Sequence, residues 1–411
     1  MSRVLIAHPG AAHFIYELVV AAVGLGHDTR FATGFYHDPK GGLARLVARL
    51  PSGLAAKLER ELKRRSFPGL DPAIVDTDAL LELAYVGSAR IFRSRPALPE
   101  RVMHWRNSTF DARIAARIRA AASAPEIVIG HDTSCLETLR AARERGALAV
   151  LNQMIGHLAI GDAILREEAE RQPLWADSMH AGAPAWLIDQ CRQEALTADR
   201  ILSPSPYVSE TLRQVGVPEE RIRLQPFGVR VDRFRPAERP RGDGKIRLLY
   251  VGQISQRKGL AYLLEAMARL QRSDLELVLV GGIVGAGRGL EAYRPWFRHI
   301  PNVPHHEVAD LFRSADLFVY PSLHEGSALA LIEAMASGLP VITTLNSGTL
   351  ARDGEDGVLV PIRAVDPLAE AITRLADDPT TRAAMAASAR ARALEFTWDH
   401  YRTRLVETLA R

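Results

Sequence analysis

Short apolar runs alternate with amphipathic segments along most of this sequence, and that alternation limits its fold more than any other feature. The runs RVLIA (residues 3–7), EIVIG (126–130) and ALAVL (147–151) have the length of strands, whereas FIYELVVAAVGLG (14–26) has the length and spacing of a helix. Strands separated by helices predict parallel sheets with helices on both faces. We therefore predict an α/β protein built from doubly wound parallel sheets.

The alternation comes in two series, divided by a segment around residues 228–244. This segment is rich in proline, glycine and charge and has no apolar period, which is typical of a linker between domains. A chain of 411 residues is also too long for one ordinary core. We predict two Rossmann-like domains, residues 1–236 and 237–395, that face a central cleft. Open sheets of this kind bind ligands at the C-terminal ends of their strands, so the cleft is the expected ligand site.

The composition excludes several other classes of protein. No apolar run approaches the 18 or more residues of a membrane span, and the first residues lack the pattern of a signal peptide. The two cysteines, Cys135 and Cys191, have no metal-binding spacing and indicate a reducing compartment, so we expect a cytoplasmic protein. A net charge of +4 suits anionic ligands or an anionic membrane surface. Nucleic-acid binding is not expected, because no basic face with interleaved aromatic residues stands out.

Residues 324–344, HEGSALALIEAMASGLPVITT, place two carboxylates eight residues apart after the predicted strand DLFVY. Glu325 lies in a loop, whereas Glu333 lies in a predicted helix that is apolar nearly all round. A buried carboxylate is costly unless it is paired or hydrogen-bonded. Glu333 is therefore either the partner of a core arginine or the acceptor of hydrogen bonds from two vicinal hydroxyls, as on a ribose.

The start of this helix offers a position for an anion. It follows the C-terminal end of a predicted strand, and backbone N–H groups at a helix start favour phosphate. The residues that would present these groups or let a ligand approach are Gly326, Ser327, Ala328 and Leu329. We predict that they contact the ligand.

A second loop, GQISQRKG (252–259), lies between a predicted strand and a predicted helix and ends with Arg257 and Lys258. Arginine can fork onto phosphate oxygens, and lysine acts as a point charge. An isolated pair of this kind is more often two solvated surface cations. Its place just after a strand end favours contact with a phosphate group.

These segments together resemble the E-x7-E signature region of retaining GT-B glycosyltransferases of the family 4 type. Residues 324–344 resemble the signature itself, 250–267 the phosphate-binding strand–loop–helix, 198–236 the segment that leads into the linker, and 351–361 the loop and strand after the signature. The likeness is specific over residues 198–376 and only general over residues 1–197.

The resemblance implies that the C-terminal domain holds a nucleotide diphosphate sugar and that the N-terminal domain holds the acceptor. Glu333 would hold the ribose hydroxyls, Glu325 would lie by the donor sugar, and Arg257 and Lys258 would meet the diphosphate. The last helix, residues 396–411, would pack back on the N-terminal domain. No metal or other cofactor is expected.

Several further positions carry weaker predictions. In the resembling family many members have arginine where this chain has Gln253, next to Gly252, so Arg257 supplies that charge instead or the diphosphate is held more weakly. Gly10 follows the first strand, where a small residue lets a backbone approach a ligand or simply makes a tight turn. The tripeptide DTD (76–78) matches a metal-binding pattern of another fold, but its acids are interpreted as helix-capping residues.

Two histidines follow predicted strands on the acceptor side. His157, in LNQMIGH, lies where members of the family place a histidine near the sugar, and we predict a catalytic role for it. His131 begins HDTSCLET at another strand end. Either residue could instead be a structural histidine. The long helical stretch 152–195 is expected to shape the acceptor side.

Residues 43–66 contain seven lysines and arginines and two glutamates, interleaved with leucine, valine and alanine and divided by Pro51. A basic amphipathic helix can lie on an anionic membrane. The alternative is an ordinary solvated helix. Membrane contact would place a cytoplasmic enzyme on the inner face of the membrane, near a lipid-linked acceptor.

The leading prediction is a retaining glycosyltransferase that moves a sugar from a nucleotide diphosphate sugar to a hydroxyl of a glycan, a lipid-linked acceptor or a small molecule. One alternative is a nucleotide-sugar epimerase on the same fold, which would turn over the donor without an acceptor. The other is a non-catalytic nucleotide-sugar-binding protein, which loss of the carboxylates or of the basic pair would favour. This chain retains all four residues: Glu325, Glu333, Arg257 and Lys258.

Overall fold

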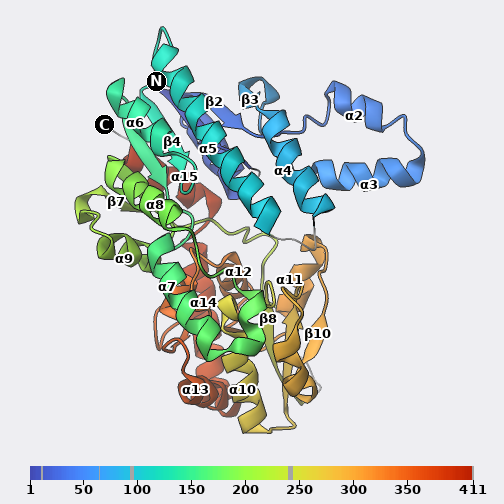
Figure 1. Ribbon diagram of the computed structural model, residues 1–411. Coiled ribbons are helices and arrows are strands. Elements are labelled where there is room, and N and C mark those ends of the chain that lie inside the picture. Colours follow the sequence, from blue (N-terminus) through green and yellow to red (C-terminus); the bar gives the residue numbers. More distant parts are fainter. Residues whose placement is uncertain (11–12, 64, 93–96, 239–243, 410–411) are drawn as a thin grey trace.

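The computed structural model describes residues 1–10, 13–63, 65–92, 97–238 and 244–409 (Figure 1). It contains two parallel sheets, of seven and six strands, with helices packed around them. The predicted α/β class with two doubly wound sheets is therefore confirmed. Part of the predicted linker, residues 239–243, lies outside the described residues, and the predicted boundary between the domains stays a prediction.

The first sheet has the strand order β3-β2-β1-β4-β5-β6-β7, and every neighbouring pair is parallel. Its strands are β1 (Arg3–His8), β2 (Asp28–Thr33), β3 (Val75–Thr77), β4 (Ile127–His131), β5 (Leu148–Asn152), β6 (Arg200–Ser203) and β7 (Ile222–Leu224). The helices of this region are α1 (His13–Gly24), α2 (Gly42–Val47), α3 (Ser52–Lys63), α4 (Ala79–Ile91), α5 (Ala97–Ala120), α6 (Leu136–Glu144), α7 (Leu158–Arg171), α8 (Ala185–Thr197) and α9 (Pro206–Gln214).

The second sheet has the order β10-β9-β8-β11-β12-β13 and is also parallel throughout. Its strands are β8 (Ile246–Val251), β9 (Leu275–Val280), β10 (Arg298–Ile300), β11 (Leu317–Tyr320), β12 (Val341–Thr343) and β13 (Gly357–Leu359). Its helices are α10 (Leu260–Leu270), α11 (His305–Arg313), α12 (Leu329–Ala336), α13 (Val365–Asp377) and α14 (Pro379–Leu394). In both sheets the strand order reverses at the first strand, between β1 and β4 and between β8 and β11, which is where such sheets bind ligands.

The last helix, α15 (Trp398–Leu409), leaves the second sheet and packs beside α1 on the first (Figure 1). Its apolar side chains Tyr401, Leu405 and Leu409 are buried in the same core cluster as Val4 and Ile6 of β1. The Gln225 side chain also donates a hydrogen bond to the carbonyl of Tyr401 over 2.7 Å. The C-terminus is therefore part of the core of the first sheet.

A segment from the first half of the chain crosses in the other direction. It comprises α7 and the 3₁₀ turn Pro173–Ser178, and we call it the α7 arm. Trp175 of the arm is buried in the core cluster of the second sheet, where a side chain at Gly289 would collide with its ring. We expected this stretch to shape the acceptor side, but its far end packs on the second sheet instead.

Candidate functional site

A cavity of about 420 Å³ is lined by residues from both halves of the chain and lies where the strand order of the second sheet reverses, between β8 and β11. The first sheet's side contributes Phe14, Met154, Ile155 and Phe227, and the second contributes Gly252, Arg257, Lys258, Tyr320 and the segment 325–330. The cavity therefore contains residues from both loops that the sequence singled out. The contacts below show how the chain brings them together.

Two cations and one carboxylate form the charged part of the cavity. Arg257 donates a hydrogen bond from Nη1 to Oε1 of Glu325 over 2.7 Å, and the Lys258 ammonium group contacts the same oxygen. Arg257 also donates to the carbonyl of His324 over 3.0 Å. The three charges sum to a net +1, so the group remains attractive to an anion.

Burial governs the electrostatics of these cations. Burial, followed by the neighbouring charge of Arg257, lowers the pKa of Lys258 well below its usual value. Burial likewise lowers the pKa of Arg257. The Glu325 carboxylate in contact with both groups favours their charged forms. Cations held in a poorly solvated site act more strongly on a developing negative charge than cations in water.

The turn that carries these cations is fixed by close backbone packing. It is a 3₁₀ turn, Gln256–Lys258, which ends at Gly259 with φ +73°. A Cβ at Gly259 would lie 2.0 Å from the carbonyl oxygen of Pro321, so glycine is required there on both counts. The carbonyl of Arg257 in turn accepts a hydrogen bond from the N–H of Leu323 over 2.9 Å. The two loops of the second sheet are therefore locked to each other.

Two aromatic rings pack against the same turn. Tyr250 and Tyr320 stack with ring centroids 5.3 Å apart, and the Lys258 ammonium lies 5.3 Å from the centroid of the Tyr320 ring. The Tyr250 hydroxyl donates to the carbonyl of Gln253 over 2.6 Å. Gln253 itself has an exposed side chain and does not line the cavity, whereas Gly252 does.

The start of α12 differs in part from the prediction. The helix begins at Leu329, and the N–H of Ala328 already donates to the carbonyl of Ser347 over 3.2 Å, so it is not free for a ligand as we expected. Within the described part of the chain, the N–H groups of Leu329 and Ala330 have no acceptor. Both residues line the cavity together with Gly326, Ser327 and Ala328. Of the predicted donors, Ala328 is therefore occupied, whereas Leu329 is open and Ala330 adds a further open N–H group.

Glu333 is half-buried and not fully buried as we expected. The reason is its helical position: the buried face of α12 carries Leu331, Ile332, Met335 and neighbouring alanines. Residues three and four apart share a helix face, so Glu333 lies on the same face as Leu329 and Ala330, which line the cavity. Glu333 itself is not among the residues that line the cavity.

The loop before α12 interlocks with the first sheet. The N–H of Gly156 donates to the carbonyl of Glu325 over 3.1 Å, and the Ser205 hydroxyl donates to the carbonyl of Gly326 over 2.5 Å. A Cβ at Gly326 would lie 1.8 Å from the carbonyl oxygen of Met154. The absence of a side chain at Gly326 therefore allows the two sides of the cavity to meet.

His157 lies apart from the cavity. It is fully buried at the N-cap of α7, where its Nδ1 accepts a hydrogen bond from the N–H of Ala159 over 3.2 Å. Burial lowers the pKa of its imidazole. His157 is not among the residues that line the cavity, and this placement favours the structural alternative over the predicted catalytic role.

His324, which we did not single out, lies next to Glu325 at the junction of the two sheets. Its Nδ1 pairs with the Tyr207 hydroxyl over 2.7 Å, and a Cβ at Gly156 or Gly161 would collide with its ring. Burial, and next the charge of Arg257, lowers its pKa to about 4. Its position directly before the first carboxylate of the signature was the only signal in the sequence.

The switch point of the first sheet is lined by neutral imidazoles. His8 pairs through Nδ1 with the backbone of Gly10 over 2.7 Å, and its ring contacts that of His131 edge to face, with centroids 4.8 Å apart. His131 in turn pairs with the Asn152 amide over 3.0 Å. Burial lowers the pKa of His8 to about 4 and that of His131 well below its usual value. Gly10 lies at this edge but does not line the cavity.

A buried arginine places a guanidinium near Gly10. Arg106 of α5 lies within 3.8 Å of a Cβ built at Gly10 and pairs with Glu82 over 2.7 Å. Glu82 also pairs with Arg65 over 3.2 Å. This ion-pair network links the switch point of the first sheet to the base of α3, and the sequence gave no spacing signal for it.

Two features are absent from the described residues, a cluster of metal ligands and a membrane-spanning helix. No group of three or more histidine, cysteine, aspartate or glutamate side chains there is arranged to hold a metal ion. None of the helices described has both the length and the apolar character required to span a bilayer. Asp78 of the DTD tripeptide occupies the N-cap of α4, although its side chain makes no capping hydrogen bond and contacts Arg113 instead.

Comparison with known proteins identifies the family. Residues 245–378 match the family described as glycosyl transferases group 1. D-inositol 3-phosphate glycosyltransferase of Geodermatophilus obscurus is 30% identical over 303 residues, which cover 58% of this chain and 67% of that protein. The chain belongs to the group 1 glycosyltransferase family. The enzyme of the same name from Streptosporangium roseum is 31% identical over 244 residues, 53% of this chain and 56% of that protein. The chain thus spans about half the length of most of the relatives it matches.

Solved structures extend the likeness in fold to the whole chain. Sucrose-phosphate synthase from Thermosynechococcus elongatus superposes with a TM-score of 0.65 at 19% identity, over 99% of this chain and 98% of that one. Anabaena HepE in complex with UDP superposes with a TM-score of 0.63 at 14% identity, over 100% and 99%. The family member described here therefore has the GT-B fold, as its sequence predicted.

Proposed function

We propose that this group 1 family member is a retaining glycosyltransferase that uses a nucleotide diphosphate sugar and needs no metal ion. The observation that carries the proposal is the pair Arg257 and Lys258 beside Glu325 in a cavity shared by both sheets. A departing diphosphate gains negative charge, and preorganised cations there lower the barrier. One structural neighbour was solved with UDP and another form of it with UDP-glucose, which makes uridine nucleotides the first donors to test.

In this proposal the second sheet binds the donor. Arg257, Lys258 and the open N–H groups of Leu329 and Ala330 hold the diphosphate. Glu333 accepts hydrogen bonds from the two ribose hydroxyls. Glu325 faces the sugar and stabilises positive charge that develops at the anomeric carbon. Gly326, Ser327, Ala328 and Gly252 shape the donor pocket.

The transfer step balances without another reactant. The bond between the anomeric carbon and the diphosphate oxygen breaks, and its electron pair leaves with the diphosphate. The acceptor hydroxyl oxygen bonds to the same carbon from the same face, and its proton passes to the departing diphosphate. The first sheet holds the acceptor near its switch point, and the interlocked loops around Gly326 and Gly156 limit access of water.

In the experiment, the chain is incubated with UDP-glucose and then with GDP and ADP sugars, each with and without a panel of acceptors. A metal chelator is present throughout, because the proposal requires no metal ion. NMR of the products follows the anomeric configuration. Transfer with retained configuration is the expected result. Inversion of configuration contradicts the mechanism, turnover of the donor without acceptor identifies an epimerase, and binding without any turnover identifies a non-catalytic protein.

We also infer that α2 and α3 meet an anionic membrane, which would place a cytoplasmic enzyme beside a lipid-linked acceptor. The two helices project from the side of the first sheet (Figure 1). Leu43, Leu46 and Leu54 are 43%, 59% and 49% exposed there, amid the basic residues noted above. The basic stretch that Pro51 divides forms two helices, which end and begin on either side of this proline.

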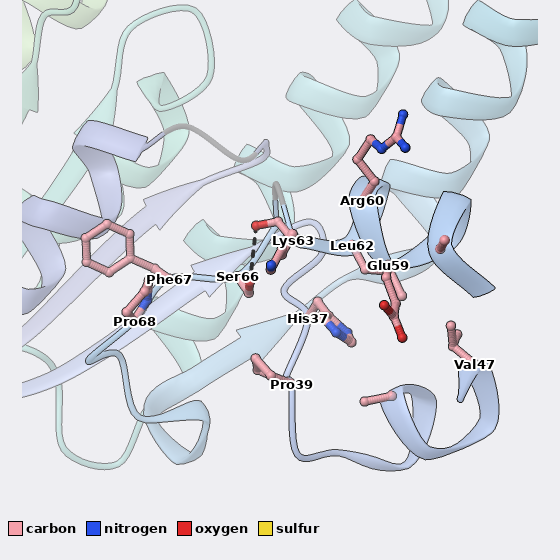
Figure 2. A pocket seen from close by; sticks show the side chains of 12 residues that line it. His37, Pro39, Val47, Glu59, Arg60, Leu62, Lys63, Ser66, Phe67 and Pro68 are labelled. Carbon is pink, nitrogen blue, oxygen red and sulfur yellow. Dashed lines mark hydrogen bonds between the residues drawn. The ribbon is translucent and has the colours of Figure 1, made fainter. Parts of the chain in front are cut away.

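A cavity of about 750 Å³ lies between these helices and the loops that carry them (Figure 2). Val47 and Leu62 line it with apolar surface, and Arg60 and Lys63 line it from α3. Apolar side chains flanked by cations suit the interfacial region of an anionic bilayer.

Co-sedimentation with vesicles containing anionic lipid, at low and high salt, tests the membrane contact. We expect binding at low salt that weakens with salt and with the triple variant Arg45→Glu, Arg49→Glu, Arg60→Glu, because each basic residue near such a surface contributes about 1 kcal/mol. A matched triple variant on helices of the second sheet, Arg269→Glu, Arg374→Glu, Arg382→Glu, is the control. Absence of low-salt binding by the unmodified chain refutes the contact.

A further inference from the structure

The α7 arm carries a buried carboxylate that hydrogen-bonds to residues of the second sheet's half. Glu168 is fully buried, although α7 belongs to the helices around the first sheet. Its Oε1 accepts hydrogen bonds from the Gln256 side chain over 2.7 Å and from the Tyr262 hydroxyl over 2.8 Å. Its Oε2 accepts from Nε of Arg363 over 2.7 Å. Glu168 thus joins three residues of the second sheet's half, and these four residues are called the Glu168 latch.

The latch is anchored at the turn that carries the two cations. Gln256 is fully buried and is the first residue of the 3₁₀ turn that continues with Arg257 and Lys258. Its side-chain oxygen accepts from the N–H of Ala261 over 2.8 Å, and its own N–H donates to the Ser178 hydroxyl of the α7 arm over 2.9 Å. The carbonyl of Gln256 accepts from the N–H of Gly259 over 2.8 Å, so all four polar groups of this residue are occupied, two of them by the arm.

The far side of the latch carries backbone strain. Arg363 has φ +63°, a region that residues other than glycine rarely adopt. Its guanidinium donates to Glu168, to Glu167 over 2.8 Å and to the carbonyl of Ile164 over 3.0 Å, all on the α7 arm. Strained conformations of this kind persist only where the surroundings hold them, and they concentrate at functional sites. The surroundings that hold Arg363 are contacts with the arm.

We infer that Glu168 is a positioning residue for donor binding: through Gln256 it fixes the turn that points Arg257 and Lys258 at the diphosphate. The inference rests on the proposed function, because it assigns to these cations a diphosphate ligand. The chemistry requires it to act at a distance, since Glu168 does not line the cavity and cannot touch the donor. Displacement of a positioned group by about 1 Å is enough to cost up to a hundredfold in rate.

A role in mere stability of the interface predicts something different. A carboxylate that only stabilises the contact between the two halves would change the free energy of unfolding. Its effect on nucleotide affinity would not depend on Arg257 and Lys258. A positioning residue acts through those cations, so its effect disappears when they are removed. A double-mutant cycle separates the two cases.

The test uses Glu168→Gln, which keeps the shape and removes the charge, with Glu170→Gln as control. Glu170 lies on the same helix two residues further on and is exposed. Calorimetry measures the affinity of the unmodified chain and of each variant for UDP, GDP and ADP. For the nucleotide that binds the unmodified chain, we expect Glu168→Gln to lower the affinity by about tenfold and Glu170→Gln to leave the affinity unchanged. In a background of Arg257→Ala and Lys258→Ala, Glu168→Gln should change the residual affinity by less than about twofold.

A second variant keeps the test decisive if Glu168→Gln does not fold. Tyr262→Phe removes one hydroxyl from the same carboxylate, and we expect a loss of about threefold in nucleotide affinity that also vanishes without the two cations. Equal affinities of Glu168→Gln and the unmodified chain, or an equal loss with and without the cations, overturn the inference. Failure of the unmodified chain to bind any of the three nucleotides would instead overturn the proposed function.

Discussion

The points at which the strand order reverses have the same topology in the two sheets and different chemistry. At the second sheet, Arg257 and Lys258 converge on Glu325, and three charged groups share a few ångströms. At the first sheet, the rings of His8 and His131 meet edge to face, and burial lowers the pKa of both below neutrality. The edge of the second sheet therefore holds a cluster of fixed charges in the cavity, whereas the edge of the first sheet combines neutral imidazoles with the paired charges of Arg106 and Glu82.

The difference teaches which partner each edge suits. A diphosphate that gains charge requires cations, and the edge that we propose as the donor site holds two of them. An acceptor hydroxyl is neutral, so neutral imidazoles beside charges that are already paired are sufficient to orient it in this proposal. Substitutions at one edge should therefore change the binding or turnover of one substrate and leave that of the other unchanged.

Removal of charge from the donor edge should have the largest effect. Lys258→Ala takes away a buried ammonium while Arg257 still neutralises Glu325. We expect kcat for sugar transfer to fall by about a hundredfold or more. A matched exposed cation in the same half of the chain, Arg269→Ala, should retain the activity of the unmodified chain. A decrease in kcat of less than threefold for Lys258→Ala would contradict the charge assignment.

Glu333→Ala should affect donor binding alone. A carboxylate that accepts from two ribose hydroxyls contributes charge-assisted hydrogen bonds, so its loss should weaken nucleotide affinity by about tenfold. Titration calorimetry of the variant measures this, and Glu370→Ala, an exposed carboxylate on α13, is the control. Unchanged affinity in Glu333→Ala would exclude the ribose contact.

His8→Ala should act on the acceptor edge. It removes the imidazole that orders the backbone of Gly10, and we expect kcat/KM for the acceptor to fall by about fivefold while nucleotide affinity stays constant. Steady-state kinetics at saturating donor, together with calorimetry, separate the two quantities. A parallel loss of nucleotide affinity would mean that the two edges are not separable.

At neutral pH we expect His324→Gln to have the smallest effect of these substitutions, because it replaces a neutral side chain by another neutral one. Its effect should appear in the free energy of unfolding at acidic pH. The folded-state pKa of His324 is about 4, below the ordinary value of 6.5, so the unfolded chain takes up a proton first as pH falls. The stability that neutral His324 contributes is therefore present above pH 6.5 and lost between pH 6.5 and pH 4, by up to about 1.4 kcal/mol per pH unit. Thermal unfolding of His324→Gln should show a flatter pH dependence over that window than unfolding of the unmodified chain. Identical slopes would contradict the buried neutral state.

The sequence predicted the fold where the apolar pattern is long enough to read. Strands such as β1 and β8 are six residues of mostly apolar side chains, whereas the edge strands β3, β7 and β10 have three residues each, too few for any period, and were not predicted. Such strands are defined by their pairing with a neighbour, which is a tertiary property.

The residues of the candidate site likewise divide into those that the sequence predicted and those that it did not. Arg257, Lys258 and Glu325 come together as their loops predicted, since parallel strand ends meet at one edge. Glu168 gave no signal, because EEAER on a helix looks like a solvated charged face until the arm is seen to cross to the second sheet. The role of His157 stays a prediction, since a histidine after a strand can cap the next helix, as it does here, as well as face a ligand.

The central claim is that the charged edge binds a nucleoside diphosphate. The most direct measurement is the thermal unfolding of the unmodified chain, Glu333→Ala and Lys258→Ala with UDP, GDP, ADP, TDP and CMP, first in chelator and then with magnesium. Ligand that binds only the folded state raises the unfolding temperature. We predict stabilisation of the unmodified chain by one diphosphate in chelator, reduced in both variants. Stabilisation by none of the nucleotides, or equal stabilisation of all three proteins, would contradict the account.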